Sequence, residues 1–269
     1  MSEESLTDTD GFFSRSSKGP LEVYNMKNVR RGLALIFNYE EFDPDLKMNP
    51  RFGSETDCKN LKRSLKGLGF EVNVFTNLRQ EVLKETISKT AKDDHSNADC
   101  LLVVFMSHGH GGHVYTYDGE LAIKDITDKF RGTKCKSLAG KPKIFIFQAC
   151  RGSEHDQPVD SANTEVNIIE AGSINTFPAG SDFIMCYSVA KGFFSFRSTV
   201  NGSWYIQDLC KLLEKYGDSL EFTQLLTLVN RDVATRDGRM RINHDYVKTK
   251  QMPCFASMLT KNLYFHPKK

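Results

Sequence analysis

The sequence predicts a doubly wound α/β fold, in which helices cover both faces of a sheet. Five apolar runs of strand length recur along the chain, and most of them are apolar at almost every position. Such runs are typical of parallel strands that are buried on both faces. Segments with helical periodicity lie between several of them, and strands that alternate with helices form a sheet of this class.

The expected elements follow in chain order. Strands are predicted at residues 32–37, 70–75, 99–106, 143–148 and 182–188, with a sixth at residues 262–265. Between the first two strands, apolar side chains recur at helical spacing from Cys58 to Leu68, which predicts a helix there. Further helices are predicted at residues 80–91, 203–216 and 220–233.

The composition excludes several classes of protein. A chain of 269 residues is long enough for one large α/β domain, or two small ones, with a sizeable core. With 39% hydrophobic and 26% charged residues, neither disorder nor a fibrous repeat is expected. The net charge is +2, and we interpret the short basic cluster of Lys27, Arg30 and Arg31 as a solvated face. No nucleic-acid partner is therefore predicted.

No membrane segment or secretion signal is predicted. The longest apolar stretches, such as residues 100–106, are far shorter than the roughly 18 consecutive apolar residues of a membrane span. The acidic N-terminus lacks the apolar core of a signal peptide. The seven cysteines are scattered and never spaced C-x-x-C, which is typical of free thiols in a reducing compartment. We expect a cytoplasmic protein, with the nucleus as a further location.

One stretch departs from the apolar pattern. Residues 153–175 contain few apolar side chains and many Asp, Glu, Ser, Asn and Gly residues. A linker of that length is uncommon inside a compact domain unless it has a function, and exposed polar loops are where proteases cut. The polar segment that ends near Asp10 has the same character.

Reactive residues follow two of the predicted strands. His108 and Gly109 come just after the strand at 99–106, and Cys150 comes just after the strand at 143–148. Because ligands bind at the carboxyl ends of strands in parallel α/β sheets, neighbouring strands would bring His108 and Cys150 together. An imidazole beside a thiol lowers the thiol pKa and later protonates the leaving amine. The backbone N–H groups of Gly109 and Cys150 form a candidate oxyanion hole.

Each of these residues alone has a plainer interpretation. A single cysteine at a strand end is more often a small buried hydrophobe, and a single histidine is more often a core or surface residue with its hydrogen bonds satisfied. The pentapeptide Gln-Ala-Cys-Arg-Gly at residues 148–152 changes that balance. With a histidine roughly 50 residues upstream, it is a signature of caspases.

The sequence resembles the caspases over nearly its whole length. Matching segments run from RRGLALIFN near Arg30, through SHG and QACRG, to GSWYIQDLC at residues 202–210 and FASMLTKNLYF near the C-terminus. It is most similar to the executioner caspases, nearest the caspase-6 branch, and we expect no long prodomain. The resemblance implies a three-layer sandwich with a central, mostly parallel six-stranded sheet. It also implies a cysteine endopeptidase that cleaves proteins after aspartate in apoptosis.

The resemblance implies roles for individual residues. Cys150 would be the nucleophile, His108 the general base and acid, and Gly109 part of the oxyanion hole. The aspartate that precedes the cleaved bond, called P1, would be bound by two guanidinium groups and an amide, from Arg51, Arg197 and Gln148. Guanidinium forks bind a carboxylate through two charge-assisted hydrogen bonds, so this receptor is physically sensible. The neighbouring subsites would be formed by Phe194, Phe196, Ser198 and Trp204.

The resemblance also implies processing and partners. We expect a propeptide at residues 1–10, a large subunit at 11–160, a linker at 161–170 and a small subunit at 171–269, with cleavage after Asp10 and Asp160. The enzyme would be a homodimer of large and small subunit pairs without a cofactor. Its partners would be protein substrates with P1 aspartate, upstream caspases and inhibitor-of-apoptosis proteins. Executioner caspases usually carry Asp before the small subunit, where this chain has Glu170, so Asp156 competes with Asp160 as the main cleavage site.

Three alternatives are weighed against this hypothesis. A catalytically silent homologue, acting as a scaffold or decoy, usually lacks the cysteine, the histidine or the arginines, and none is lost here. A metacaspase-like enzyme cleaves after Arg or Lys and needs an acidic pocket, which Arg51 and Arg197 oppose. A metal-binding module would use His108, His110 and His113, but a glycine-rich loop does not guarantee convergent ligands, so no metal site is predicted. The preference at P4 stays open, because relatives vary near Phe196 and Ser198.

Overall fold

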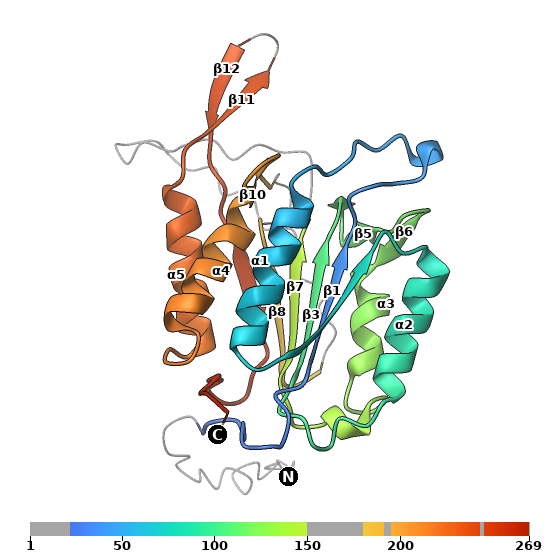
Figure 1. The fold of residues 1–269 in the computed structure, drawn as a ribbon, viewed down its shortest axis with the longest axis vertical. Helices are drawn as coiled ribbons and strands as arrows, with labels where there is room; N and C mark the ends of the chain where they lie inside the picture. The colour runs from blue at the N-terminus through green and yellow to red at the C-terminus, as the bar shows by residue number, and fades with distance from the viewer. Residues whose placement is uncertain (1–21, 150–179, 191–194, 243–244, 269) are drawn as a thin grey trace, which may run out of the picture.

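A six-stranded sheet forms the centre of the protein (Figure 1). The computed structural model describes residues 22–149, 180–190, 195–242 and 245–268. The spatial order of the strands is β13-β8-β7-β3-β1-β2; five run parallel and β13 runs antiparallel to β8. Their bounds are β1 (Leu33–Asn38), β2 (Glu71–Thr76), β3 (Leu101–Met106), β7 (Lys143–Gln148), β8 (Phe183–Tyr187) and β13 (Cys254–Ser257).

Helices cover both faces of this sheet, as the sequence predicts. Figure 1 shows α1 (Ser54–Gly67), α4 (Trp204–Tyr216) and α5 (Phe222–Thr235) on one side, and α2 (Gln80–Lys92) and α3 (Ile123–Thr127) on the other. Alternate residues of β1 supply the two cores: Ala34 and Ile36 pack on the α1 side, and Leu35 and Phe37 on the α2 side. The α/β class and the three layers are confirmed.

Shorter elements decorate the sheet, and the sequence did not predict them. The short strands are β4 (Gly109–His110), β5 (His113–Tyr115), β6 (Glu120–Ala122), β9 (Arg197–Ser198), β10 (Gly202–Ser203), β11 (Gly238–Ile242) and β12 (Asp245–Thr249). Three 3₁₀ helices are η1 (Pro44–Leu46), η2 (Asp128–Phe130) and η3 (Lys136–Leu138). None of the described helices is both long and apolar enough for a bilayer span.

Five of the six predicted strands and all four predicted helices are confirmed, but the strand predicted at residues 262–265 is wrong. Asn262 forms only an isolated bridge with Val23. Leu263 and Phe265 are buried in the core, and the backbone of Leu263 bonds to Glu221 and Phe222 at the start of α5 instead of to a strand. The sixth strand is β13, whose residues are mostly half-buried at the edge of the sheet.

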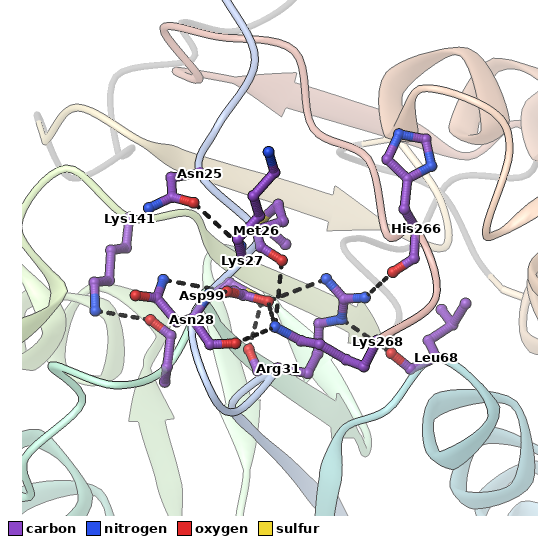
Figure 2. A network of polar contacts seen from close by, with 12 residues as sticks. Asn25, Met26, Lys27, Asn28, Arg31, Leu68, Asp99, Lys141, His266 and Lys268 are labelled. Carbon is purple, nitrogen blue, oxygen red and sulfur yellow. Dashed lines mark hydrogen bonds and ion pairs between the residues drawn. The ribbon is translucent and has the colours of Figure 1, made fainter.

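A buried charge network closes the amino-terminal end of the sheet (Figure 2). Asp99, just before β3, pairs with Arg31 at 3.1 Å, and both side chains are fully buried. Asp99 also pairs with Lys268, and Arg31 donates to the carbonyl oxygens of Leu68 and His266. Because breaking such a pair leaves an uncompensated charge in the interior, this network fastens the C-terminal segment to the sheet.

This network corrects one interpretation of the sequence. The cluster of Lys27, Arg30 and Arg31 was expected to be a solvated face, and Lys27 is exposed. Arg30 forms a partly exposed pair with Glu71. Arg31, however, is 1% exposed, because Asp99 and two carbonyl groups satisfy its guanidinium inside the protein.

Several predictions concern residues that the structure does not describe. The propeptide 1–10, the processed linker 161–170 and both cleavage residues, Asp10 and Asp160, lie outside the described ranges. So do Cys150 and Phe194.

Candidate active site

The strand order places a topological switch point between β1 and β3. From β1 the chain continues to β2 on one side, and then crosses to β3 and β7 on the other. In open α/β sheets, ligands bind outside the carboxyl ends of the strands at such a point. The residues that follow β1 and β3 are therefore the first candidates for a site.

The pairing of β3 with β7 is parallel and in register up to its last residues. Met106 lies opposite Gln148, and the backbone N–H of Ser107 donates to the carbonyl oxygen of Gln148 at 3.1 Å. Both strands thus end at the same level. His108 follows Met106 by two residues, and Cys150 follows Gln148 by two in the sequence. The contact between His108 and Cys150 stays a prediction, since Cys150 is outside the described residues.

His108 is half-buried, and a hydrogen bond and a ring contact fix its orientation. Its Nε2 lies 2.8 Å from the carbonyl oxygen of Asn49, and its ring packs against Phe42 with 5.0 Å between centroids. A carbonyl oxygen only accepts, so this hydrogen bond places the proton of the neutral ring on Nε2. Nδ1 is then left with its lone pair, which is the form that a general base needs.

The surroundings of His108 keep it neutral. Burial is the main cause that lowers its pKa below the usual 6.5, and the charges of Arg51 and Arg197 lower it further. The hydrogen bond to Asn49 acts in the opposite direction. Since the net shift is downward, the ring keeps its lone pair to a lower pH than a free imidazole does.

The two arginines come from distant segments and meet at the loop that joins β1 to α1. Arg51, 1% exposed, donates from Nη1 to the carbonyl oxygen of Tyr39 at 2.8 Å. Arg197 on β9 donates from Nε to the carbonyl oxygen of Phe52, the residue after Arg51, at 2.9 Å. Both guanidinium charges act on His108, so the structure brings the two predicted P1 arginines together beside the predicted base.

Gln148 ends β7 with its side chain 2% exposed. Its Nε2 donates to the Ser195 hydroxyl at 2.6 Å. Its Oε1 has no hydrogen-bond partner in the described parts of the chain. A buried amide oxygen without a partner is unusual, and because it only accepts, it suits a donor rather than a substrate carboxylate; of the two amide atoms, Nε2 is the one that could donate to P1 aspartate.

Comparison with known proteins decides the family. The sequence profile of the caspase domain matches residues 31–264. The chain belongs to the caspase family. It is 52% identical to Caspase-6 of Gallus gallus over 274 residues, covering 98% of this chain and 90% of that protein. Caspase-6 of Mus musculus is also 52% identical, over 98% of this chain and 99% of its own length, and Caspase-3 of Mus musculus is 38% identical over 90% and 87%. The protein is thus a cysteine-type endopeptidase, of the aspartate-specific class that acts in apoptosis.

The aromatic wall predicted for this caspase is partly described. Phe196 and Trp204 stack with 4.9 Å between ring centroids. The guanidinium of Arg236 lies over the ring of Trp204, 5.9 Å from its centroid. The hydroxyl of Ser198 accepts from the backbone N–H groups of Val200 and Asn201, so it serves the β9–β10 turn.

The histidines after His108 do not form a metal site in the part of the caspase that the structure describes. His110 lies opposite His113 in the β4–β5 pair and bonds to Glu120 at 3.0 Å, whereas His108 faces Asn49. Among the described residues, no group of three or more His, Cys, Asp or Glu side chains is arranged to hold a metal ion.

Other contacts at this caspase site could not be read from the sequence. The Asn49 carbonyl orients His108, but a backbone oxygen leaves no signature in the residue type. Gln251, fully buried, accepts from the backbone N–H of Phe196 at 2.7 Å and donates to the carbonyl oxygen of Ser188. Asp57 on α1 is also fully buried beside both arginines, and burial raises its pKa to about 6.

A separate cavity of about 450 Å³ lies near the site without containing it. Its lining comes from the ends of β1 and β2 and from α1, and includes Asn38, Cys58 and Thr76. Of the predicted catalytic and P1-binding residues that the structure describes, none lines it.

The electrostatic setting of His108 yields a test. In a Cys150→Ala variant, proton NMR of the His108 ring should show a titration midpoint below 6.5, because burial and two cations disfavour the imidazolium. Adding Arg197→Gln removes one cation and should move the midpoint upward. Arg236→Gln is the matched control, since Arg236 is not among the charges that act on His108, and should leave the midpoint in place. A midpoint at or above 6.5, or no response to Arg197→Gln, contradicts this description.

Proposed function

We propose that this caspase is an executioner: an aspartate-specific endopeptidase made as a zymogen in the cytoplasm. The observation that carries the specificity is the pair of guanidiniums, Arg51 and Arg197, held by one loop beside the predicted base. A pocket with two cations suits a substrate carboxylate. It opposes a metacaspase-like preference for arginine or lysine.

The reaction uses the lone pair on Nδ1 of His108. Nδ1 takes the proton of the Cys150 thiol while the sulfur attacks the carbonyl carbon of the P1 residue. The oxyanion is stabilised by the backbone N–H groups of Gly109 and Cys150. The imidazolium then gives its proton to the leaving amine, and a water activated by the same nitrogen releases the acyl group from sulfur. The Asn49 carbonyl keeps the proton on Nε2 throughout, in the place that a carboxylate takes in other nucleophile–base systems.

The P1 pocket selects through charge and geometry together. A carboxylate loses its hydration on entering, and fixed opposite charge offsets that cost. Glutamate has the same charge but one more methylene, so it cannot meet both forks in the geometry that aspartate uses. Asparagine keeps the shape but leaves both guanidiniums without an anion.

Steady-state kinetics on matched tetrapeptides test this proposal. The kcat/KM should be highest for P1 Asp, much lower for Glu, and lower still for Asn, by roughly 10⁴ to 10⁵ if the site rejects an analogue that lacks its polar partner. Arg197→Lys keeps the charge but loses the fork, and should lower kcat/KM for the Asp peptide by about two orders of magnitude. Cys150→Ala should show no cleavage and controls for contaminating proteases. Best cleavage of a P1 Arg peptide would establish an acidic pocket instead.

A catalytically silent homologue remains the second candidate function. It is disfavoured because His108, Cys150, Arg51 and Arg197 are all present. The hydrogen bond from Nε2 of His108 to the Asn49 carbonyl, which leaves the lone pair of the neutral ring on Nδ1, also favours an active enzyme.

We also infer zymogen processing and a homodimer. Cleavage after Asp10 and Asp160 fits their polar surroundings in the sequence. The edge strand β13 supports a dimer, because in the described part of the chain no strand pairs with its second edge, and open edges favour pairing with another chain.

Native mass spectrometry after self-incubation tests both inferences at once. We expect fragments that begin at Gly11 and at Ser161, assembled as two large and two small subunits. Asp160→Ala should block the second cut, and Asp156→Ala should not. Cleavage at Asp156, or an assembly with one pair of subunits, would show that the corresponding inference is wrong.

A further inference from the structure

We propose that Asp57 is a positioning residue of the P1 pocket, whose carboxylate holds the β9–β10 hairpin, and with it Arg197, against α1. The proposal rests on the P1 role of Arg51 and Arg197. It assigns to Asp57 the task of keeping two arginines from distant segments pointed at one substrate carboxylate.

The carboxylate of Asp57 is committed to Ser203, 146 residues away in the chain. The backbone N–H of Ser203 donates to Oδ1 at 2.8 Å and to Oδ2 at 3.0 Å. The Ser203 hydroxyl donates to Oδ2 at 2.5 Å. Hydrogen bonds to a charged group are the stronger kind, so this one side chain makes a firm joint between α1 and the start of α4.

Ser203 is the residue directly opposite Arg197. The antiparallel pair β9–β10 places Ser203 across from Arg197 and Gly202 across from Ser198. A shift of Ser203 would therefore carry the backbone of Arg197 with it. The helix that carries Asp57 is also linked to the second arginine. The backbone N–H of Ser54, at the start of α1, donates to the carbonyl oxygen of Arg51 at 3.1 Å.

Two glycines show how closely the hairpin meets α1. Gly202 has φ +85°, and a Cβ there would lie 2.1 Å from Oδ1 of Asp57. Gly53, before α1, has φ +88°, and a Cβ there would lie 2.3 Å from the carbonyl oxygen of Ser198. The hydroxyl of Thr56 adds a bond to the carbonyl oxygen of Val200 at 3.1 Å. The first turn of α1 thus meets the hairpin along its length, and Asp57 is the charged contact in that seam.

A purely structural anchor would not need to be an acid beside the arginines. Burial disfavours the charged form of Asp57 and raises its pKa to about 6, while the bonds from Ser203 and the charges of Arg51 and Arg197 favour the carboxylate. The charge of Asp57 also acts on the thiols of Cys58 and Cys210, whose pKa it helps to raise. The carboxylate accepts from both Ser203 donors at once, which a protonated acid or an amide does less well.

The test separates positioning from folding. Asp57→Ala should raise KM for the P1 Asp peptide by about tenfold or more, the loss expected for one or two charge-assisted hydrogen bonds. It should also reduce the ratio of kcat/KM between the Asp and Glu peptides, with kcat per titrated active site nearly unchanged. Asp57→Asn and Ser203→Ala, which each keep part of the joint, should give smaller shifts in the same direction.

Asp182→Asn is the matched control. Asp182 is likewise a buried acid that accepts hydrogen bonds, from Tyr24 and Thr260, but it lies at the amino end of β8, away from the pocket. Its KM and Asp/Glu ratio should equal those of the unmodified protein. If Asp57→Ala does not fold, Asp57→Asn and Ser203→Ala carry the test.

Two outcomes overturn the proposal. An unchanged KM and Asp/Glu ratio in the folded variants would mean that Asp57 is a structural anchor only. A lower KM in Asp57→Asn would mean that its charge repels the substrate more than its bonds position Arg197. If instead the unmodified protein shows no preference for P1 Asp, the proposed function itself fails, which is a different result from either.

Discussion

The in-register pairing of β3 with β7 is the constraint on which the rest of the site depends. It ends both strands at one level, with Met106 opposite Gln148 and the Ser107 N–H bonded to the Gln148 carbonyl. A one-residue slip would exchange the two faces of the strand and move every core side chain. The buried, two-sided packing that makes these strands apolar is therefore also what aligns His108 with the segment that continues into Cys150. Stability and chemistry are set by the same register.

Buried charged side chains have different partners at the two ends of the sheet. At the amino-terminal end, Asp99 pairs with both Arg31 and Lys268 inside the protein. At the carboxyl end, Arg51 and Arg197 each donate a hydrogen bond to a backbone carbonyl oxygen, which helps to orient the guanidinium groups. Asp57 lies near both but directs its hydrogen bonds to Ser203. Burial, and after it the charges of Arg51 and Arg197, lower the pKa of His108 at this end of the sheet.

How far the sequence predicts this structure depends on the kind of contact. Continuous apolar runs predicted the four central strands β1, β3, β7 and β8, because burial on both faces leaves a strong pattern, whereas the predicted strand β2 lies at an edge and is only partly buried. The edge strand β13 was missed, since half-buried residues next to Pro253 carry little pattern, and Leu263 and Phe265 imitated a strand while packing against α5. His108 followed from its place after a strand. Arg51 and Arg197 were predicted from family resemblance alone, because the sequence does not distinguish a buried arginine from a surface arginine. The Asn49 carbonyl could not be predicted, because the conformation of the loop, and not the Asn49 side chain, positions that oxygen.

We infer that the ends of β3 and β7 and the two arginines form one site for an aspartyl peptide. A crystal structure of the protein with a tetrapeptide aldehyde that ends in aspartate measures this directly, because a thiol adds reversibly to the aldehyde carbon. We predict the adduct on Cys150, the aspartate carboxylate between Arg51 and Arg197 beside Gln148, and Nδ1 of His108 facing the sulfur. An adduct on another cysteine, or a carboxylate bound away from both arginines, would contradict the account.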